Sequence, residues 1–159
     1  MDNPYYERLV NASIRFISFR PRSEKELRDF LSKKLTKWKV SGDVLLEKVV
    51  ARMGELGYVD DIKFAEWWVG QRTDFKPKGN SYIKMELKAK GVPEAIIRSV
   101  LVARGSESLL AAARAAVARK IPLWAKLPVL ERQKKLYDYL GRRGFDGSTI
   151  RKLIDGDGK

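Results

Sequence analysis

Cysteine and histidine are both absent from this 159-residue sequence. Without cysteine the chain can form neither a disulfide nor a thiolate metal site. Without histidine it lacks the usual general base, the usual zinc ligand and any Ser-His-Asp arrangement. There is also no Walker loop and no dinucleotide-binding glycine fingerprint. We therefore expect a protein that is not an enzyme and has no cofactor and no metal site.

Long apolar runs are missing as well. No apolar stretch approaches the length that is needed to cross a bilayer. The first residues, Met1-Asp2-Asn3-Pro4, lack the apolar segment behind a basic start that marks a signal peptide. We therefore expect a cytoplasmic protein.

Acidic residues are outnumbered, with 20 Asp and Glu against 33 Lys and Arg, which gives a net charge of +13 and a pI near 10.0. Such a balance favours polyanions or acidic protein surfaces as partners. The charge is uneven, because the segment from Asp43 to Asp74 leans acidic while the chain is basic before it and again from Arg114 onward. Two positive ends therefore flank a more negative middle.

The apolar residues recur with helical spacing throughout, and no stretch alternates as a strand does. We count nine helices. Ser23 and Glu26 have the spacing of a capping box, and Asp43 and Asp60 are possible N-caps. Gly57 can take the left-handed conformation that closes a helix.

Two patterns recur along the chain at similar offsets. One pairs Leu87-x3-Gly91-Val92 with Leu140-x3-Gly144-Phe145, and the other pairs Arg20-Pro21-Arg22-Ser23 with Lys76-Pro77-Lys78-Gly79. These offsets indicate a repeat of roughly fifty residues, present three times, each a unit of three helices. Such units stack side by side. We expect an all-α fold of three tandem three-helix repeats in an elongated, curved array.

The expected units are residues 1–57, 58–104 and 105–155, followed by a disordered tail at 156–159. The first unit has a longer connection around Thr36 to Gly42. In the third unit, Pro122 and Pro128 bracket a short linker.

The centre of the chain carries a family resemblance. Its motif runs Leu56-Gly57-Tyr58-Val59-Asp60-Asp61, then Phe64-Ala65, Arg72, Gly79, Glu86-Leu87 and Gly91-Val92. In order and spacing this resembles the RecX family, the small bacterial regulators of the RecA recombinase, over roughly Arg20 to Leu101. The resemblance implies tandem three-helix repeats and a non-enzymatic regulator of homologous recombination and DNA repair. It also implies binding in the helical groove of the RecA–DNA filament, which inhibits filament extension, ATPase and strand exchange.

The partners that this resemblance implies are the RecA filament and single- or double-stranded DNA within it, bound by a monomer. The contact residues that we expect are chosen by charge and by repeat position: Arg20, Arg22, Lys76, Lys78, Lys134, Lys135, Arg142 and Arg143. The alternative for the two proline turns is that they are solvated loop charges. The repetition of the turn at equivalent positions weighs against that alternative.

Three aromatic residues and two carboxylates need separate interpretation. Trp67 and Trp68 are adjacent on a helix, so both cannot be central in one core, and Trp68 fits the apolar stripe. Trp67 or Trp38 could stack on bases, but we favour packing between repeats. Asp60 and Asp61 begin a helix and diverge there, so capping explains them without catalysis.

Two other functions stay open. Three-helix units of this size also resemble helix-turn-helix domains, so the chain could be a module that binds nucleic acid alone. It could instead be a repeat scaffold that binds only protein. Charge reversal at the two proline turns would leave the function of such a scaffold intact.

Overall fold

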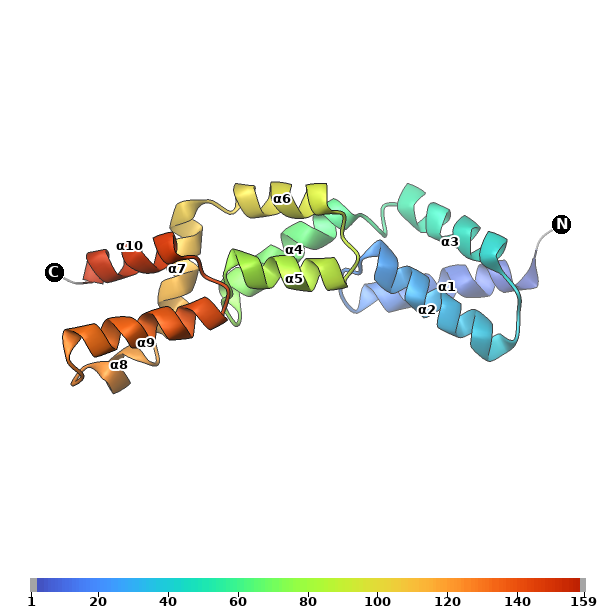
Figure 1. The fold of residues 1–159 in the computed structure, drawn as a ribbon. Helices are drawn as coiled ribbons and strands as arrows, with labels where there is room; N and C mark the ends of the chain where they lie inside the picture. The colour runs from blue at the N-terminus through green and yellow to red at the C-terminus, as the bar shows by residue number, and fades with distance from the viewer. Residues whose placement is uncertain (1–2, 158–159) are drawn as a thin grey trace.

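The computed structural model describes residues 3–157, which form ten α-helices and no strand (Figure 1). The helices are α1 (Pro4–Ser18), α2 (Glu24–Trp38), α3 (Asp43–Glu55), α4 (Asp61–Asp74), α5 (Asn80–Ala89), α6 (Glu94–Ala103), α7 (Ser106–Val117), α8 (Ile121–Trp124), α9 (Val129–Arg142) and α10 (Gly147–Asp157). The predicted all-α class is confirmed. Within these residues, no helix is both long enough and apolar enough to span a bilayer.

Apart from the short α8, the helices group in threes: α1 to α3, α4 to α6, and α7 with α9 and α10. The three groups follow one another in an elongated row with the termini at opposite ends (Figure 1). In each triplet the first helix packs on the third: α1 on α3, α4 on α6 and α7 on α10. The second helices α2, α5 and α9 lie along the lower edge in Figure 1, and the third helices lie along the upper edge. The predicted row of three-helix repeats is therefore confirmed.

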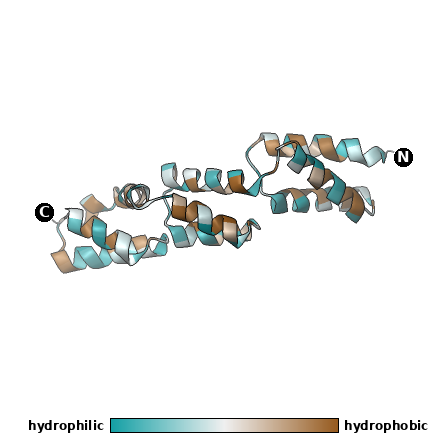
Figure 2. Ribbon diagram, turned by 90° about the horizontal axis from the view of Figure 1, so that it is seen from above, coloured by the Kyte–Doolittle hydropathy of each residue, from teal (hydrophilic) through white to brown (hydrophobic). Residues whose placement is uncertain are grey.

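Each triplet encloses a hydrophobic core of its own. The centres of these cores are Leu27, Leu31 and Met53 in the first, Phe64, Ile83 and Leu87 in the second, and Val117, Leu140 and Leu153 in the third. Along most helices apolar and polar residues are interspersed (Figure 2), as expected for helices that bury one face. Full burial of one such side chain contributes about 1.5–3 kcal/mol. Val59, which the expected boundary assigns to the second unit, packs in the first core, and the unit boundaries stay a prediction.

Most of the predicted helix ends are confirmed. Ser23 and Glu26 form both hydrogen bonds of a capping box, and the Asp60 carboxylate accepts hydrogen bonds from the amides of Ile62 and Lys63. Gly91 and Gly144 have φ values of 75° and 90°. These left-handed values let the chain reverse after α5 and after α9.

Other local predictions were wrong. Asp43 is not an N-cap, because α3 begins at Asp43 and its capping residue is Gly42, which provides no side-chain hydrogen bond. The predicted longer connection from Thr36 is partly helix, since α2 continues to Trp38 and ends with Lys39 at a φ of 56°.

The expected linker and tail also contain helix. Between Pro122 and Pro128 the chain first completes α8, the helix missing from our count of nine, with a proline in its first turn. Proline is tolerated there because the first amides of a helix have no intrahelical partner. Helix α10 continues through Asp157, so part of the expected disordered tail is helical. Gly158 and Lys159 lie outside the described residues.

Candidate binding surface at the repeat junctions and second helices

The first junction joins the proline turn before α2 to the end of α5. The Ser23 hydroxyl donates a hydrogen bond to the Lys90 carbonyl at 2.7 Å, and the Glu24 amide donates one to the Asp61 carboxylate at 2.9 Å. A Cβ atom on Gly91 would lie 2.5 Å from the Cβ of Lys25. Real side chains do not approach so closely, and glycine is therefore required for this contact between repeats.

Three cations surround one carboxylate at the first junction. The Glu26 carboxylate pairs with Arg20, with Arg22 at 3.8 Å and with Lys90 at 3.5 Å. Burial by itself would raise the pKa of Glu26. Hydrogen bonds from Arg20 and from the Ser23 amide, together with the charge of Lys90, instead hold that pKa below its ordinary value.

The two arginines of the first turn are largely engaged within the molecule. The Arg22 guanidinium lies 4.0 Å from the centroid of the Phe16 ring and donates a hydrogen bond to the Phe16 carbonyl at 3.2 Å. The Arg20 guanidinium donates to the Pro21 carbonyl at 2.7 Å. Their side chains are only 28% and 16% exposed, for Arg20 and Arg22 respectively. Arg20 and Arg22 therefore lie within a junction rather than project from it, and their expected role in binding stays a prediction.

The second junction repeats this geometry between α5 and the end of α9. The Gly79 amide donates a hydrogen bond to the Arg143 carbonyl at 2.8 Å, and the Ser81 hydroxyl donates one to the Gly144 carbonyl at 3.1 Å. A Cβ atom on Gly79 would overlap the backbone atoms of Gly144. The backbone at Gly79 therefore packs directly against the backbone at Gly144, which explains why both positions hold glycine.

Three of the expected contact residues come together at the second junction. Lys76 is exposed, while the half-buried Lys78 places its ammonium 4.2 Å from the centroid of the Tyr82 ring. Arg143 lies 4.5 Å from the centroid of the Tyr139 ring. Burial lowers the pKa of Lys78, and repulsion by Arg143, Arg72 and Lys76 lowers it further, against the smaller opposing effect of Glu86.

The remaining expected residues, Lys134, Lys135 and Arg142, are exposed on α9. They belong to a longer surface feature that sequence reasoning missed, which we call the lysine row. It consists of the exposed cations of the three second helices: Lys25, Lys33, Lys37, Lys84, Lys88, Lys134, Lys135 and Arg142. The signal that could have found it was the excess of cations over acids in each second helix, with lysines four residues apart at Lys33 and Lys37 and at Lys84 and Lys88.

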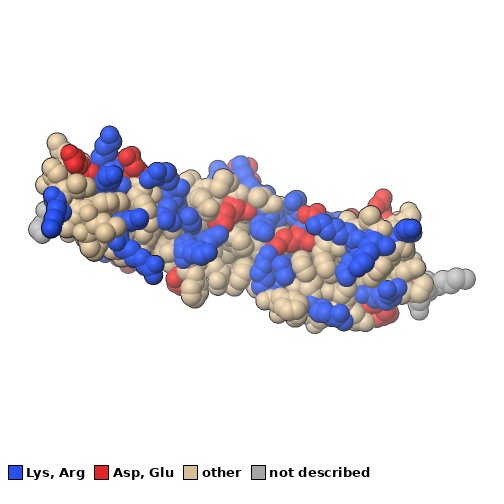
Figure 3. All heavy atoms as spheres, turned by 90° about the horizontal axis from the view of Figure 1, so that it is seen from below, with Lys and Arg blue, Asp and Glu red and all other residues tan. Residues whose placement is uncertain are grey.

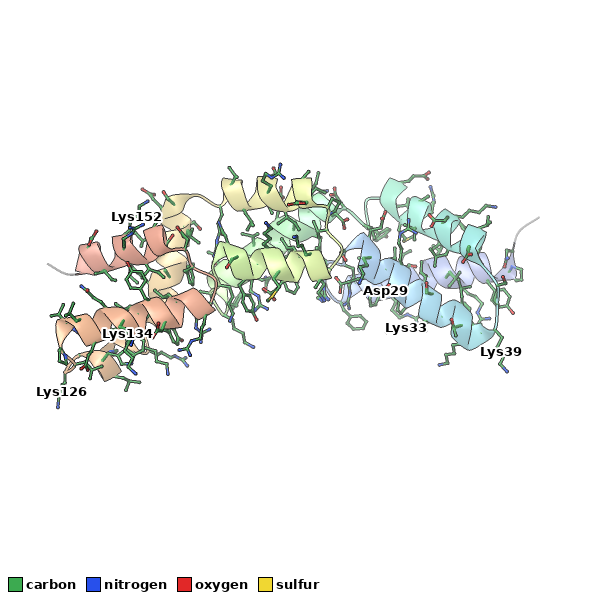
Figure 4. All side chains as sticks on the ribbon, viewed as in Figure 1. Asp29, Lys33, Lys39, Lys126, Lys134 and Lys152 are labelled. Carbon is green, nitrogen blue, oxygen red and sulfur yellow. The ribbon has the colours of Figure 1, made fainter. Side chains whose placement is uncertain are left out.

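The lysine row carries the excess charge of the helical surface. The same helices carry eight exposed cations but only four exposed acids, which are Glu24, Asp29, Glu131 and Asp138. On the described first helices four exposed cations match four acids, and on the described third helices five match five. Figure 3 shows Lys and Arg along the whole length of the lower face. In Figure 4, Lys33 and Lys134 lie on α2 and α9, whereas Lys152 lies on α10 at the opposite edge.

The tryptophans contribute to packing. Trp67 is half-buried and packs against the second core of its own repeat, and the Arg20 guanidinium of the first repeat lies 6.0 Å from the centroid of its ring. It therefore packs within its repeat and also contacts the neighbouring one. Trp68 packs against the second core, with Lys90 at 5.6 Å from its ring centroid. Trp38 stacks on Tyr5 in the first repeat.

The acidic residues play structural parts. Asp60 caps α4, while Asp61 accepts the Glu24 amide across the first junction, a role that sequence reasoning missed. Burial raises the pKa of Asp61. Within residues 3–157, no group of three or more acidic side chains lies close enough to hold a metal ion.

Comparison with known proteins adds the family. The second three-helix domain of RecX matches residues 60–101 of this chain, and the third matches residues 107–154. The regulatory protein RecX of Prosthecochloris aestuarii is 34% identical over 146 residues, which cover 92% of this chain and 91% of that protein. The chain belongs to the RecX family.

Other RecX proteins are similar to this chain in sequence or in fold, and they differ in length. The regulatory protein RecX of Chlorobium phaeobacteroides is 34% identical, over 94% of this chain and 93% of its own length. That of Bacillus velezensis is 28% identical over 94% of this chain but only 55% of its own length. The crystal structure of RecX from Lactobacillus salivarius superposes with a TM-score of 0.82 over 95% of both chains at 20% identity, which shows the shared fold.

Proposed function

We propose that this protein regulates homologous recombination and DNA repair by binding the RecA–DNA filament and inhibiting its extension, ATPase and strand exchange. The membership in a family of regulatory proteins supports a regulatory role. A partner on DNA implies action in the bacterial cytoplasm. No catalytic step is needed, because occupancy of the filament by a bound monomer restrains it.

The observation that carries this proposal is the lysine row. It follows the long axis of an elongated molecule, and the charges of the other exposed helical faces balance. A polyanionic filament offers negative charge over a comparable length, so several weak contacts can form together. Contacts that are linked in one chain reinforce one another, because each raises the effective concentration of the next.

The test is the RecA ATPase on single-stranded DNA with added protein. We expect inhibition by the natural chain and its loss in a variant that reverses one charge on each second helix, Lys33→Glu, Lys84→Glu and Lys134→Glu. The matched control reverses one exposed charge on each third helix, Lys48→Glu, Arg98→Glu and Lys152→Glu. An unchanged ATPase rate at several-fold excess of the natural chain would refute the proposal, and equal loss in both variants would refute the role of the lysine row.

The second candidate is a helix-turn-helix-like module that acts on nucleic acid alone, and the same lysine row supports it. It predicts tight, salt-sensitive binding to free DNA and no effect on the RecA ATPase. Titration of labelled DNA with and without RecA distinguishes the two functions.

A further inference from the structure

We propose that the second junction, at Lys76, Lys78, Tyr82 and Arg143, binds the backbone phosphates of a single-stranded nucleic acid, whereas the first junction does not. This inference rests on the proposed function, since it names one place on the molecule where the DNA of the filament is held.

The two junctions have the same layout. Arg20 and Arg22 in the first proline turn correspond to Lys76 and Lys78 in the second. On the other side of each contact a cation precedes the glycine turn, Lys90 before Gly91 and Arg143 before Gly144. In both cases the carbonyl of that cation accepts the hydrogen bond that joins the repeats.

The two junctions differ in charge at one equivalent position. In α2 the position two residues after the start of the helix holds Glu26, and in α5 the equivalent position holds Tyr82. Glu26 pairs with all three cations of the first junction. Tyr82 offers no negative charge, and Lys78 rests on its ring.

Glu86, an acid near the second junction, already pairs with Arg72. Glu86 accepts from Arg72 through both oxygens, at 3.0 Å from Nε and 2.5 Å from Nη2. Among the described residues, Lys76, Lys78 and Arg143 form no ion pair. The second junction therefore carries three cations that no carboxylate of the described chain pairs with, and an anion that binds there is stabilised by their charge.

The surroundings favour a nucleic-acid strand over an acidic peptide. Phe75 precedes Lys76 and leaves 66% of its surface exposed, beside the proline turn. Exposed aromatic rings next to lysines are the features with which proteins hold single strands, since bases stack on the rings while the cations meet phosphates. A lysine ammonium also meets a phosphate as a point charge, without the paired geometry that arginine needs. Phe19 is 79% exposed at the equivalent place in the first junction, but the cations there already pair with Glu26.

The test measures anisotropy of a labelled oligothymidylate with the full chain, without RecA, at several salt concentrations. Tyr82→Glu supplies the carboxylate that Glu26 provides at the first junction, and Tyr82→Gln is its uncharged control. We expect Tyr82→Glu to weaken binding about tenfold and Tyr82→Gln no more than about twofold. The logarithmic salt slope falls by about 0.7 for each phosphate that the variant no longer neutralises.

A second pair of variants covers the case in which Tyr82→Glu does not fold. Lys76→Gln with Lys78→Gln removes two charges at the junction, and Lys48→Gln with Arg98→Gln removes two exposed charges from third helices. We expect about a tenfold decrease in affinity for the first pair and at most about a twofold decrease for the second. Circular dichroism melts verify that each variant is folded.

Equal affinities within either pair, or no oligonucleotide binding by the natural chain, would overturn the inference. A polyglutamate peptide whose binding is abolished in Tyr82→Glu, while oligonucleotide binding persists, would assign the site to an acidic protein instead. Because RecA is left out, these outcomes are independent of the ATPase test. The regulation of RecA can hold while this site is wrong, and this site can bind DNA while RecA is unaffected.

Discussion

The first and second repeats build the same three-helix unit with different chemistry at the same places. Phe16 and Phe30 stack in the first repeat, with ring centroids 4.2 Å apart and planes within 2°. One repeat later these positions hold Arg72 and Glu86, which form an ion pair. The backbone arrangement is thus set by the apolar stripes and by the glycine turns, while partly buried positions between the first and second helices accept either an aromatic pair or a charged pair.

A second difference concerns charge at the junctions. Glu26 pairs with the three cations of the first junction, whereas the equivalent Tyr82 offers the second junction no negative charge. A repeated backbone geometry therefore does not fix a repeated surface chemistry. One junction pairs its cations with a carboxylate of the chain, while the other leaves Lys76, Lys78 and Arg143 without an ion pair among the described residues.

We expect the largest loss of stability when the backbone contact at the second junction is broken. Gly79→Ala forces a Cβ atom into the Gly144 backbone, so we expect the free energy of unfolding to fall by about 2–4 kcal/mol. Urea unfolding monitored by circular dichroism measures this. Gly54→Ala is the control, because a Cβ atom there meets nothing within 4 Å, and alanine in a helix should raise stability by about 0.5–1 kcal/mol. Equal stability of the two variants would show that the junction can relax.

The next largest loss of stability is expected when the Arg72–Glu86 ion pair of the second repeat is broken, and replacing it by the aromatic pair of the first repeat should avoid that loss. Arg72→Ala strands the mostly buried Glu86 carboxylate, so we expect a decrease of about 2–3 kcal/mol in the free energy of unfolding. The double variant Arg72→Phe with Glu86→Phe copies the aromatic pair of the first repeat and should unfold within about 1 kcal/mol of the natural chain. Urea unfolding of both variants checks this, and a double variant as unstable as Arg72→Ala would show that the repeats are not interchangeable here.

A smaller effect concerns pH. The pKa of Glu26 in the folded state lies below its ordinary value of 4.5. The stability that this group contributes is therefore present above its unfolded pKa and is lost as the pH falls through the folded value. We expect the natural chain to exceed Glu26→Gln in unfolding free energy by about 1–2 kcal/mol at neutral pH, with the gap closing on acidification. A gap that is constant from neutral pH down to about pH 3 would exclude this role for the ionised carboxylate.

The smallest effect on folding is expected from the lysine row. Lys33→Glu, Lys84→Glu and Lys134→Glu change exposed side chains, so each should alter the free energy of unfolding by no more than about 0.5 kcal/mol. Thermal melts measure this and separate impaired binding from impaired folding in the ATPase test. A larger loss of stability would mean that the row supports the fold rather than a partner.

Sequence reasoning predicted the architecture because helix signals are local. The capping box at Ser23 and the left-handed Gly57, whose φ is 78°, depend only on neighbouring residues, so their spacing was enough. It missed α8, whose single turn gives too short an apolar pattern to detect. It also placed Arg20 and Arg22 on an open surface. Glu26 was near enough in sequence to suggest a partner for them, but the enclosure by Lys90 of the next repeat depends on tertiary packing.

By itself, the sequence determined the helical class, the threefold repeat and the positive charge, because periodicity, turn residues and composition are properties of the chain as written. Only the tertiary structure decided where that charge is available. Packing brings Glu26 against three cations from two repeats and leaves Lys76, Lys78 and Arg143 beside Tyr82. It also aligns the second helices into one row. The physical reason is that charges pair across a few ångströms of space, so packing can add a cation that is distant in sequence, such as Lys90, to a carboxylate that already has local partners.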